Sequence, residues 1–290
     1  MKLIDHEDAD VAAFAAELLA DADAVSSFPI PTWLALLATR NPAVTATVAD
    51  AFRKHVDFAR VTATQAIELA LRAPVPVAAL GLDILLTREF RTPADRALLA
   101  RLSAAECAAL ADAIARFALP KLNRPGGYDI DDLTGFFDSR FRTMRSGAFA
   151  ALTPQSPADT DPAFWSRLFE SPYDDVRTEL VARLKTRSNL PGASSDSLAS
   201  LWTNVLLSIH RGGRAKLSAL RQISDHIRAN PSTTRILLPV LAIAIRSVRA
   251  PEARHGLAAI VAATQREPSL LTRVAEAFPD LQLDATVGVP

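Results

Sequence analysis

A short apolar pattern recurs along this chain at almost even intervals, and this recurrence limits the folds open to it. The pattern is an apolar residue, then a small or apolar residue four positions later, then an apolar residue four positions after that. Its seven copies are Val44, Val48, Phe52; Val77, Gly81, Leu85; Leu110, Ile114, Ala118; Met144, Ala148, Leu152; Val176, Leu180, Leu184; Ala215, Ala219, Ile223; and Ala253, Leu257, Val261. The first positions (44, 77, 110, 144, 176, 215 and 253) differ by 33, 33, 34, 32, 39 and 38 residues. With 54 alanines in the chain a single match means little, but the regular spacing predicts a structural repeat.

The copy at Val176 indicates the local structure of the repeat. Val176, Leu180 and Leu184 recur once per turn of a helix drawn at 100° per residue. Asp175 and Glu179 lie on the opposite side of that helix. The segment therefore predicts an amphipathic helix that buries one face.

Each of these helices follows a shorter apolar segment that ends near a helix-breaking residue. Four such segments are Pro31 to Ala38, Thr62 to Leu71, Asp161 to Phe169 and Ser232 to Val248. Proline is tolerated in the first turn of a helix and stops the preceding helix from continuing, so prolines mark the junctions. The predicted unit is a helical hairpin, which must stack on its neighbours to bury its apolar face.

The predicted fold class is all-α: an α-α superhelix, or solenoid, of about seven hairpins with capping helices at both ends. The first cap is a helix over residues 6–22, where the acids Asp8, Glu17 and Asp21 alternate with apolar residues; these are Val11, Phe14, Leu18 and Leu19. The closing helix is Leu270 to Phe278, and residues 281–290 form an extended tail. The whole chain is predicted to be one helical-repeat domain. Proline-rich breaks divide it into possible sub-arrays at 1–152 and 161–280, and further loops are expected at 119–130, at 153–162 and from Ser188.

These hairpins resemble the HEAT and armadillo-like repeat superfamily. The resemblance is closest at one helix, at Pro172, Asp174 or Asp175, Val176, Arg177, Leu180 and Leu184. Two further helices match next, at Met144, Arg145, Ala148 and Leu152 and at Ala253, Arg254, Leu257 and Val261. The resemblance covers roughly residues 30 to 278 and implies a curved array with an exposed groove for a protein or peptide. Because some bacterial HEAT-like proteins are DNA glycosylases, it also implies an alternative, nucleic-acid binding with base chemistry.

Charge is distributed unevenly although the chain is neutral overall, with 32 basic and 32 acidic residues. Residues 1 to 30 carry one base and seven acids, whereas residues 205 to 250 carry eight bases and one acid, Asp225. These eight bases are the candidate binding residues: Arg211, Arg214, Lys216, Arg221, Arg228, Arg235, Arg246 and Arg249. Arg214, Arg221 and Arg228 fall within about 40° on a helical wheel, opposite the apolar residues of the same segment. We name these three the arginine stripe.

The arginine stripe has two interpretations. In the first it is only the solvated face of an arginine-rich protein. In the second it binds the carboxylates of an acidic protein or peptide, or phosphates, because the guanidinium group forms paired hydrogen bonds with both. Nucleic acid is the less favoured partner, because aromatic residues that could stack on bases are not evident; Trp202 is predicted to lie in the core. The glycines of the segment His210 to Lys216 suit a phosphate or, more simply, a turn.

No catalytic constellation is found, so we predict a non-enzymatic interaction or scaffold module without cofactor. The chain has no GxGxxG, GxxxxGK[ST] or GxSxG motif, and its five histidines include no HExxH pair. Asp129, Asp131 and Asp132 do not follow the EF-hand spacing, and a helix N-cap is their simpler role. A hydrolase built on Asp129 and Asp132 near Arg124 is a third, weaker alternative. No metal site is predicted.

The remaining signals concern the environment of the protein. The most apolar run, Ile236 to Ile245, is half the length of about 20 residues that a membrane-spanning helix needs. The acidic start of the chain is unlike a secretory signal. Cys107 has no second cysteine to pair with, which fits a reducing cytoplasm. The excess of Arg over Lys, 27 to 5, favours a bacterial source.

Overall fold

In the computed structural model of the protein, the described residues are 4, 6–21, 23–39, 41–188, 194–207 and 213–281. This part of the chain contains 17 α-helices, four short 3-10 helices and no strand. The predicted all-α class is therefore confirmed. None of the described helices is both long and apolar enough to span a bilayer.

The chain divides into two compact units, residues 1–160 (unit 1) and 161–290 (unit 2). The α-helices of unit 1 are α1 (Ala9–Asp21), α2 (Ile30–Leu36), α3 (Pro42–His55), α4 (Ala63–Ala70), α5 (Val75–Leu86), α6 (Pro93–Ala100), α7 (Ala111–Leu122), α8 (Ile130–Phe137), α9 (Arg142–Ala151) and α10 (Pro157–Thr160). Its 3-10 helices are η1 (Asp23–Ser27), η2 (Phe58–Arg60) and η3 (Arg101–Ala104).

Unit 2 consists of seven α-helices and one 3-10 helix within the residues that the structure describes. They are α11 (Pro162–Phe169), α12 (Asp174–Ser188), α13 (Ser195–Leu207), α14 (Gly213–Ala229), η4 (Pro231–Thr233), α15 (Thr234–Ile245), α16 (Ala250–Arg266) and α17 (Leu270–Ala277).

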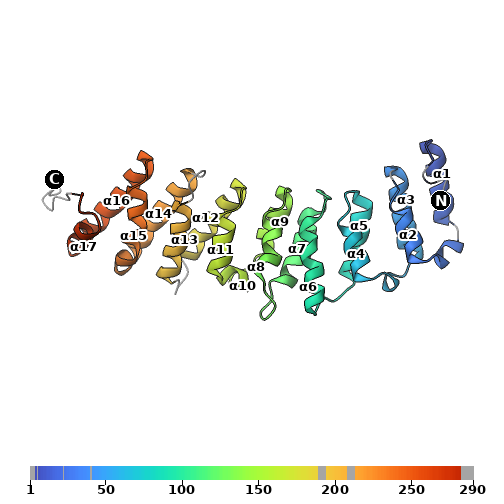
Figure 1. The fold of residues 1–290 in the computed structure, drawn as a ribbon, viewed down its shortest axis with the longest axis horizontal. Coiled ribbons are helices and arrows are strands. Elements are labelled where there is room, and N and C mark those ends of the chain that lie inside the picture. Colours follow the sequence, from blue (N-terminus) through green and yellow to red (C-terminus); the bar gives the residue numbers. More distant parts are fainter. Residues whose placement is uncertain are drawn as a thin grey trace. The chain divides into compact units, whose positions relative to one another are not determined.

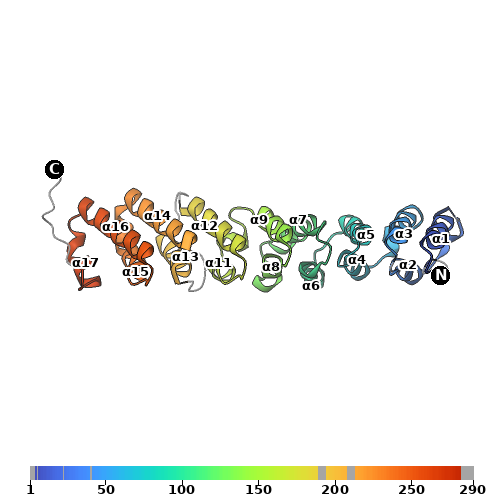
Figure 2. The same cartoon turned by 90° about the horizontal axis from the view of Figure 1, so that it is seen from above.

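Helices pack on their neighbours within each unit and form two layers there (Figures 1 and 2). In unit 1, α1 packs on α3, α3 on α5 and α7 on α9, while α4, α6 and α8 follow one another in the second layer. In unit 2, α12, α14 and α16 form one layer and α11, α13, α15 and α17 the other. Consecutive helices such as α4 with α5 and α15 with α16 join the layers.

The helices predicted from the apolar repeat are present. The seven copies coincide with α3, α5, α7, α9, α12, α14 and α16. In six copies the second and third residues are buried, as the pattern requires. For the seventh copy the predicted buried face is wrong. Leu257 is 36% exposed, and Gly256, Ile260 and Ala263 face the core instead. A Cβ atom at Gly256 would lie 3.1 Å from the Cβ atom of Ala244, so the glycine permits close packing of α16 on α15 and sets the buried face.

Polar residues start several of the helices. The Oγ1 atom of Thr62 accepts a hydrogen bond from the amide of Gln65, whose side chain accepts one from the amide of Thr62, so the two form a capping box. Asp129 caps α8 by accepting hydrogen bonds from the amides of Asp131 (2.8 Å) and Asp132 (3.3 Å). The N-cap interpretation of this acidic segment is therefore confirmed.

Prolines stop fewer helices than predicted. The loop predicted at 119–130 starts later in the structure, because α7 continues through Pro120 to Leu122. The expected loop at 153–162 contains the short helix α10. Pro239 lies inside α15, within the segment Ser232 to Val248 that the sequence predicts as one unit. Interior prolines are tolerated when tertiary packing outweighs the lost hydrogen bond. Most of the third expected loop, residues 189–193, lies outside the described residues, as does most of the predicted tail, residues 282–290.

The first cap is less polar than predicted. Ala12 and Ala16 are fully buried on the side of α1 that packs on α3, because small residues allow close contact between helices. Phe14 and Leu18 point away from the core and are 61% and 59% exposed. The outer face of α1 therefore carries two large apolar side chains.

Candidate binding site on the C-terminal helices

The arginine stripe runs along the exposed face of α14, as predicted. Arg214, Arg221 and Arg228 are all exposed, and the opposite face is buried through Ala219, Leu220, Ile223 and Ile227. Arg228 forms an ion pair with Asp225 at 3.4 Å, in which both side chains are more than half exposed. Solvent screens such a pair, so Arg228 stays available to a ligand. Arg211 lies outside the described residues.

Lys216 is not a surface binding residue, and its inclusion among the candidates is wrong. The residue is 8% exposed, and its Nζ atom lies 3.8 Å from a carboxylate oxygen of Glu252, which is also buried. The same oxygen of Glu252 accepts a hydrogen bond of 2.6 Å from the hydroxyl of Ser247. Lys216 therefore links α14 to α16 inside the unit.

Arg249 and Arg246 occupy opposite ends of the turn between α15 and α16. Arg246 is the C-cap residue of α15 and Arg249 the N-cap residue of α16, and both are exposed. The Nη1 atom of Arg249 would lie 3.4 Å from a Cβ atom at Gly213, which places its guanidinium group beside the start of α14.

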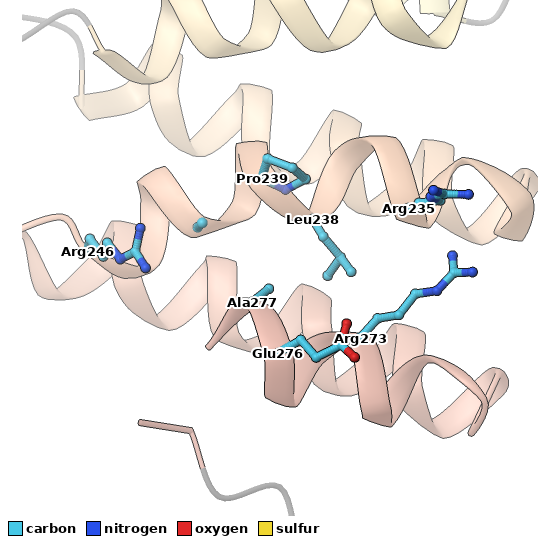
Figure 3. Close-up of a pocket in the computed structure, with 8 residues that line it drawn as sticks. Arg235, Leu238, Pro239, Arg246, Arg273, Glu276 and Ala277 are labelled. Atoms are coloured by element: carbon cyan, nitrogen blue, oxygen red, sulfur yellow. The ribbon is translucent and has the colours of Figure 1, made fainter. Parts of the chain in front are cut away.

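Arg235 and Arg246 line an open pocket between α15 and α17, which we name the α15–α17 groove (Figure 3). Its volume is about 580 Å³. Arg273, Glu276 and Ala277 contribute to it from α17, and Leu238, Pro239 and Ala242 from α15. Arg273 and Glu276 were not among the predicted residues, because they lie outside the basic segment 205–250.

The groove combines an apolar floor with charged ends. Leu238 and Ala242 are largely buried and Leu238 points between the two helices. Figure 3 shows Arg235 and Arg273 reaching toward the same end of the groove and Arg246 at the other end. Eleven residues separate Arg235 from Arg246 along α15, which corresponds to about 16 Å of helix.

Pro239 interrupts the backbone hydrogen bonds of α15 beside this groove. Proline has no N–H, so the carbonyl oxygen of Arg235, four residues earlier, receives no helical hydrogen bond from residue 239. Both residues line the groove, and Pro239 is exposed.

The groove has an excess of positive charge. It contains three guanidinium groups and one carboxylate, Glu276. Among the described residues, none of Arg235, Arg246 and Arg273 forms an ion pair. Arginine binds carboxylates through two parallel hydrogen bonds, so the groove is suited to an acidic ligand with an apolar middle.

Behind the arginine stripe, polar groups are buried in the core of unit 2. The indole Nε1 of Trp202 donates to Gln222 Oε1 (3.2 Å), and Gln222 Nε2 donates to the carbonyl of Val181 (2.9 Å). Trp202 is fully buried, as predicted. His226 packs with its ring edge-on to Trp202 at 5.5 Å, and desolvation lowers its pKa, partly opposed by a hydrogen bond to the backbone of Ser188. His226 is therefore a core residue, 8% exposed.

The other chemical candidates have structural roles in this protein. Asp132 forms an ion pair with Arg96 at 3.5 Å, and Asp129 caps α8. Cys107 is buried. Within the described ranges, no three His, Cys, Asp or Glu side chains lie close enough together to hold a metal ion.

Comparison of the sequence with protein-family models and with curated proteins finds no match.

Proposed function

We propose that this protein is a non-enzymatic interaction module, whose C-terminal helices bind an acidic segment of a partner protein. In this proposal both units are arrays of HEAT-like hairpins, about seven in total, with capping helices at the ends. Stacked repeats provide extended surfaces for binding other chains. The observation that carries the proposal is the α15–α17 groove, in which an apolar floor lies among three arginines that form no ion pair with any described residue.

Nucleic-acid binding has less support than protein binding. Trp33, Trp165 and Trp202 are each at most 1% exposed, so none of them can stack on a base. The groove also contains a carboxylate, Glu276, which would repel a phosphate backbone. An acidic peptide can place its own charges away from Glu276.

The test is titration of the protein into fluorescein-labelled peptides in which glutamates flank a pair of leucines. We expect saturable binding, detected by fluorescence anisotropy, which is lost when glutamine replaces glutamate in the peptide. Arg235→Glu with Arg246→Glu should weaken binding at least tenfold, because two charge-assisted contacts become repulsive. The matched control, Arg124→Glu with Arg142→Glu, makes the same change of net charge at exposed positions of unit 1.

Two results would contradict the proposal. One is equal binding by the groove variant and the control variant. The other is stronger binding of a single-stranded oligonucleotide than of any peptide, with a steep dependence on salt, which would favour the nucleic-acid alternative.

A further inference from the structure

We propose that the α15–α17 groove receives the outer face of α1 from a second copy of this chain. This inference rests on the proposed function, because it names an occupant of the same groove. It predicts that the protein associates with itself through its acidic first helix and its basic last helices.

The outer face of α1 has the composition that the groove requires. Asp10, Phe14, Glu17 and Leu18 are all exposed. Their spacing of four, seven and eight residues from Asp10 places them within about 100° on one side of the helix. Acidic and large apolar side chains therefore alternate along a single stripe, which we name the α1 face.

This arrangement is unusual for a helix at the edge of a helical array. A capping helix normally turns a polar side to solvent. Here Phe14 and Leu18 are 61% and 59% exposed, while Ala12 and Ala16 are buried against the rest of unit 1. The large side chains are thus left on the outside, where burial by another chain is favourable.

The charges of the two surfaces are complementary. The groove has three arginines and one glutamate. The α1 face has two acids and no base, and the first 30 residues of the chain carry a net charge of −6 (one base minus seven acids). Complementary charge favours this pairing and disfavours contact between two α1 faces or between two grooves.

The dimensions also agree. The α1 face extends from Asp10 to Leu18, eight residues or about 12 Å of helix. It fits between Arg235 and Arg246, which are about 16 Å apart along α15. With the acids directed to the arginines, Phe14 and Leu18 face the apolar floor at Leu238 and Ala242.

The first experiment is sedimentation velocity of the full chain over a range of concentrations at low ionic strength. We expect the mass to rise above the monomer value of 31.1 kDa as the concentration increases. Phe14→Ala with Leu18→Ala should abolish this rise, and so should Arg235→Glu with Arg246→Glu. Leu86→Ala is the matched control, because Leu86 is also exposed (62%) in unit 1 and lies outside the α1 face.

The decisive experiment mixes the two variants that do not self-associate. One retains an intact groove and the other an intact α1 face, so the mixture can form a single contact. We expect a 1:1 complex of about twice the monomer mass and nothing larger. Circular dichroism of each variant shows whether its helices are intact. If the Phe14→Ala, Leu18→Ala variant has lost them, Asp10→Arg with Glu17→Arg replaces it, because this pair alters only exposed charges of the α1 face.

The outcomes separate this inference from the proposed function. If the wild type stays monomeric, or if the mixed variants do not associate, α1 is not the occupant, whereas the proposed function stands as long as acidic peptides bind the groove. Self-association that persists in the Phe14→Ala, Leu18→Ala variant likewise overturns the inference. If peptides also fail to bind, the proposed function fails with it.

Discussion

The two units use their arginines differently. In unit 1, arginines connect neighbouring helices through ion pairs: Arg53 with Asp83, Arg96 with Asp132, and Arg101 with Glu68. In the last helices of unit 2, the arginines of the α15–α17 groove have no such partner within the described residues. Arginine thus joins helices in unit 1, whereas the arginines of the α15–α17 groove form no ion pair within the described residues.

The interiors of the units differ in a corresponding way. In unit 1, α4 and α5 approach so closely that a Cβ atom at Gly81 would lie 2.3 Å from the backbone nitrogen of Ala70. In unit 2, buried polar groups such as Lys216 and Glu252 link neighbouring helices. Unit 1 therefore brings two helix backbones into contact at Gly81, whereas unit 2 has a buried ionic link between Lys216 and Glu252.

The first prediction tests the close contact in unit 1 and has the largest expected effect. Gly81→Ala should destabilise the protein by about 3 kcal/mol, because the new methyl group overlaps backbone atoms that cannot move independently. The corresponding glycine of unit 2, Gly256, faces side chains at 3.1 Å and 3.2 Å. Gly256→Ala should cost less than about 1 kcal/mol, because these contacts require a shift of only a few tenths of an ångström and alanine favours a helix.

Urea unfolding followed by circular dichroism measures both substitutions. Equal losses of stability in the two variants would mean that the units are packed alike, and the contrast between them would be withdrawn.

The second prediction tests the buried ionic link of unit 2. Glu252→Gln retains the shape of the side chain but leaves the charge of Lys216 without a partner, so we expect a loss of about 2 kcal/mol. Adding Lys216→Met should restore most of this stability, because a buried ion pair can be replaced by apolar packing at little cost. A double-mutant cycle measured by urea unfolding tests this prediction. Additive effects of the two substitutions would show that the residues do not interact.

Much of the fold could be predicted from the sequence, because the signals are local. Spacing of Val176, Leu180 and Leu184 marks a buried helix face without reference to any distant residue. The prediction failed in α16, where contact with Ala244 sets the buried face at Gly256. It also failed at Pro120, where packing with other helices outweighs a local preference.

The candidate site was harder to predict, because a groove depends on which helices become neighbours. The basic segment of the sequence contains Arg235 and Arg246 but not Arg273. Arg273 comes to line the same groove only because α17 packs on α15. For Lys216 the position in the predicted helix already indicates burial. It lies three and four residues before Ala219 and Leu220, on the face of α14 that is buried.

The last prediction concerns pH and should affect unit 2 alone, with the smallest effect of the three. Burial lowers the pKa of His226 in the folded protein below 6.5, its ordinary value, which it regains on unfolding. The unfolded chain therefore binds more protons in the range between these two pKa values, and the free energy of unfolding falls as the pH decreases through 6.5.

Hydrogen exchange measured by mass spectrometry at pH 8 and pH 6, corrected for the intrinsic rates, reports on each unit separately. We expect faster corrected exchange at pH 6 in unit 2, and no such change after His226→Gln. His255→Gln, in the same unit, is the matched control and should keep the wild-type response. A response shared by both units, or unchanged by His226→Gln, would assign the acid sensitivity to other groups and remove this difference between the units.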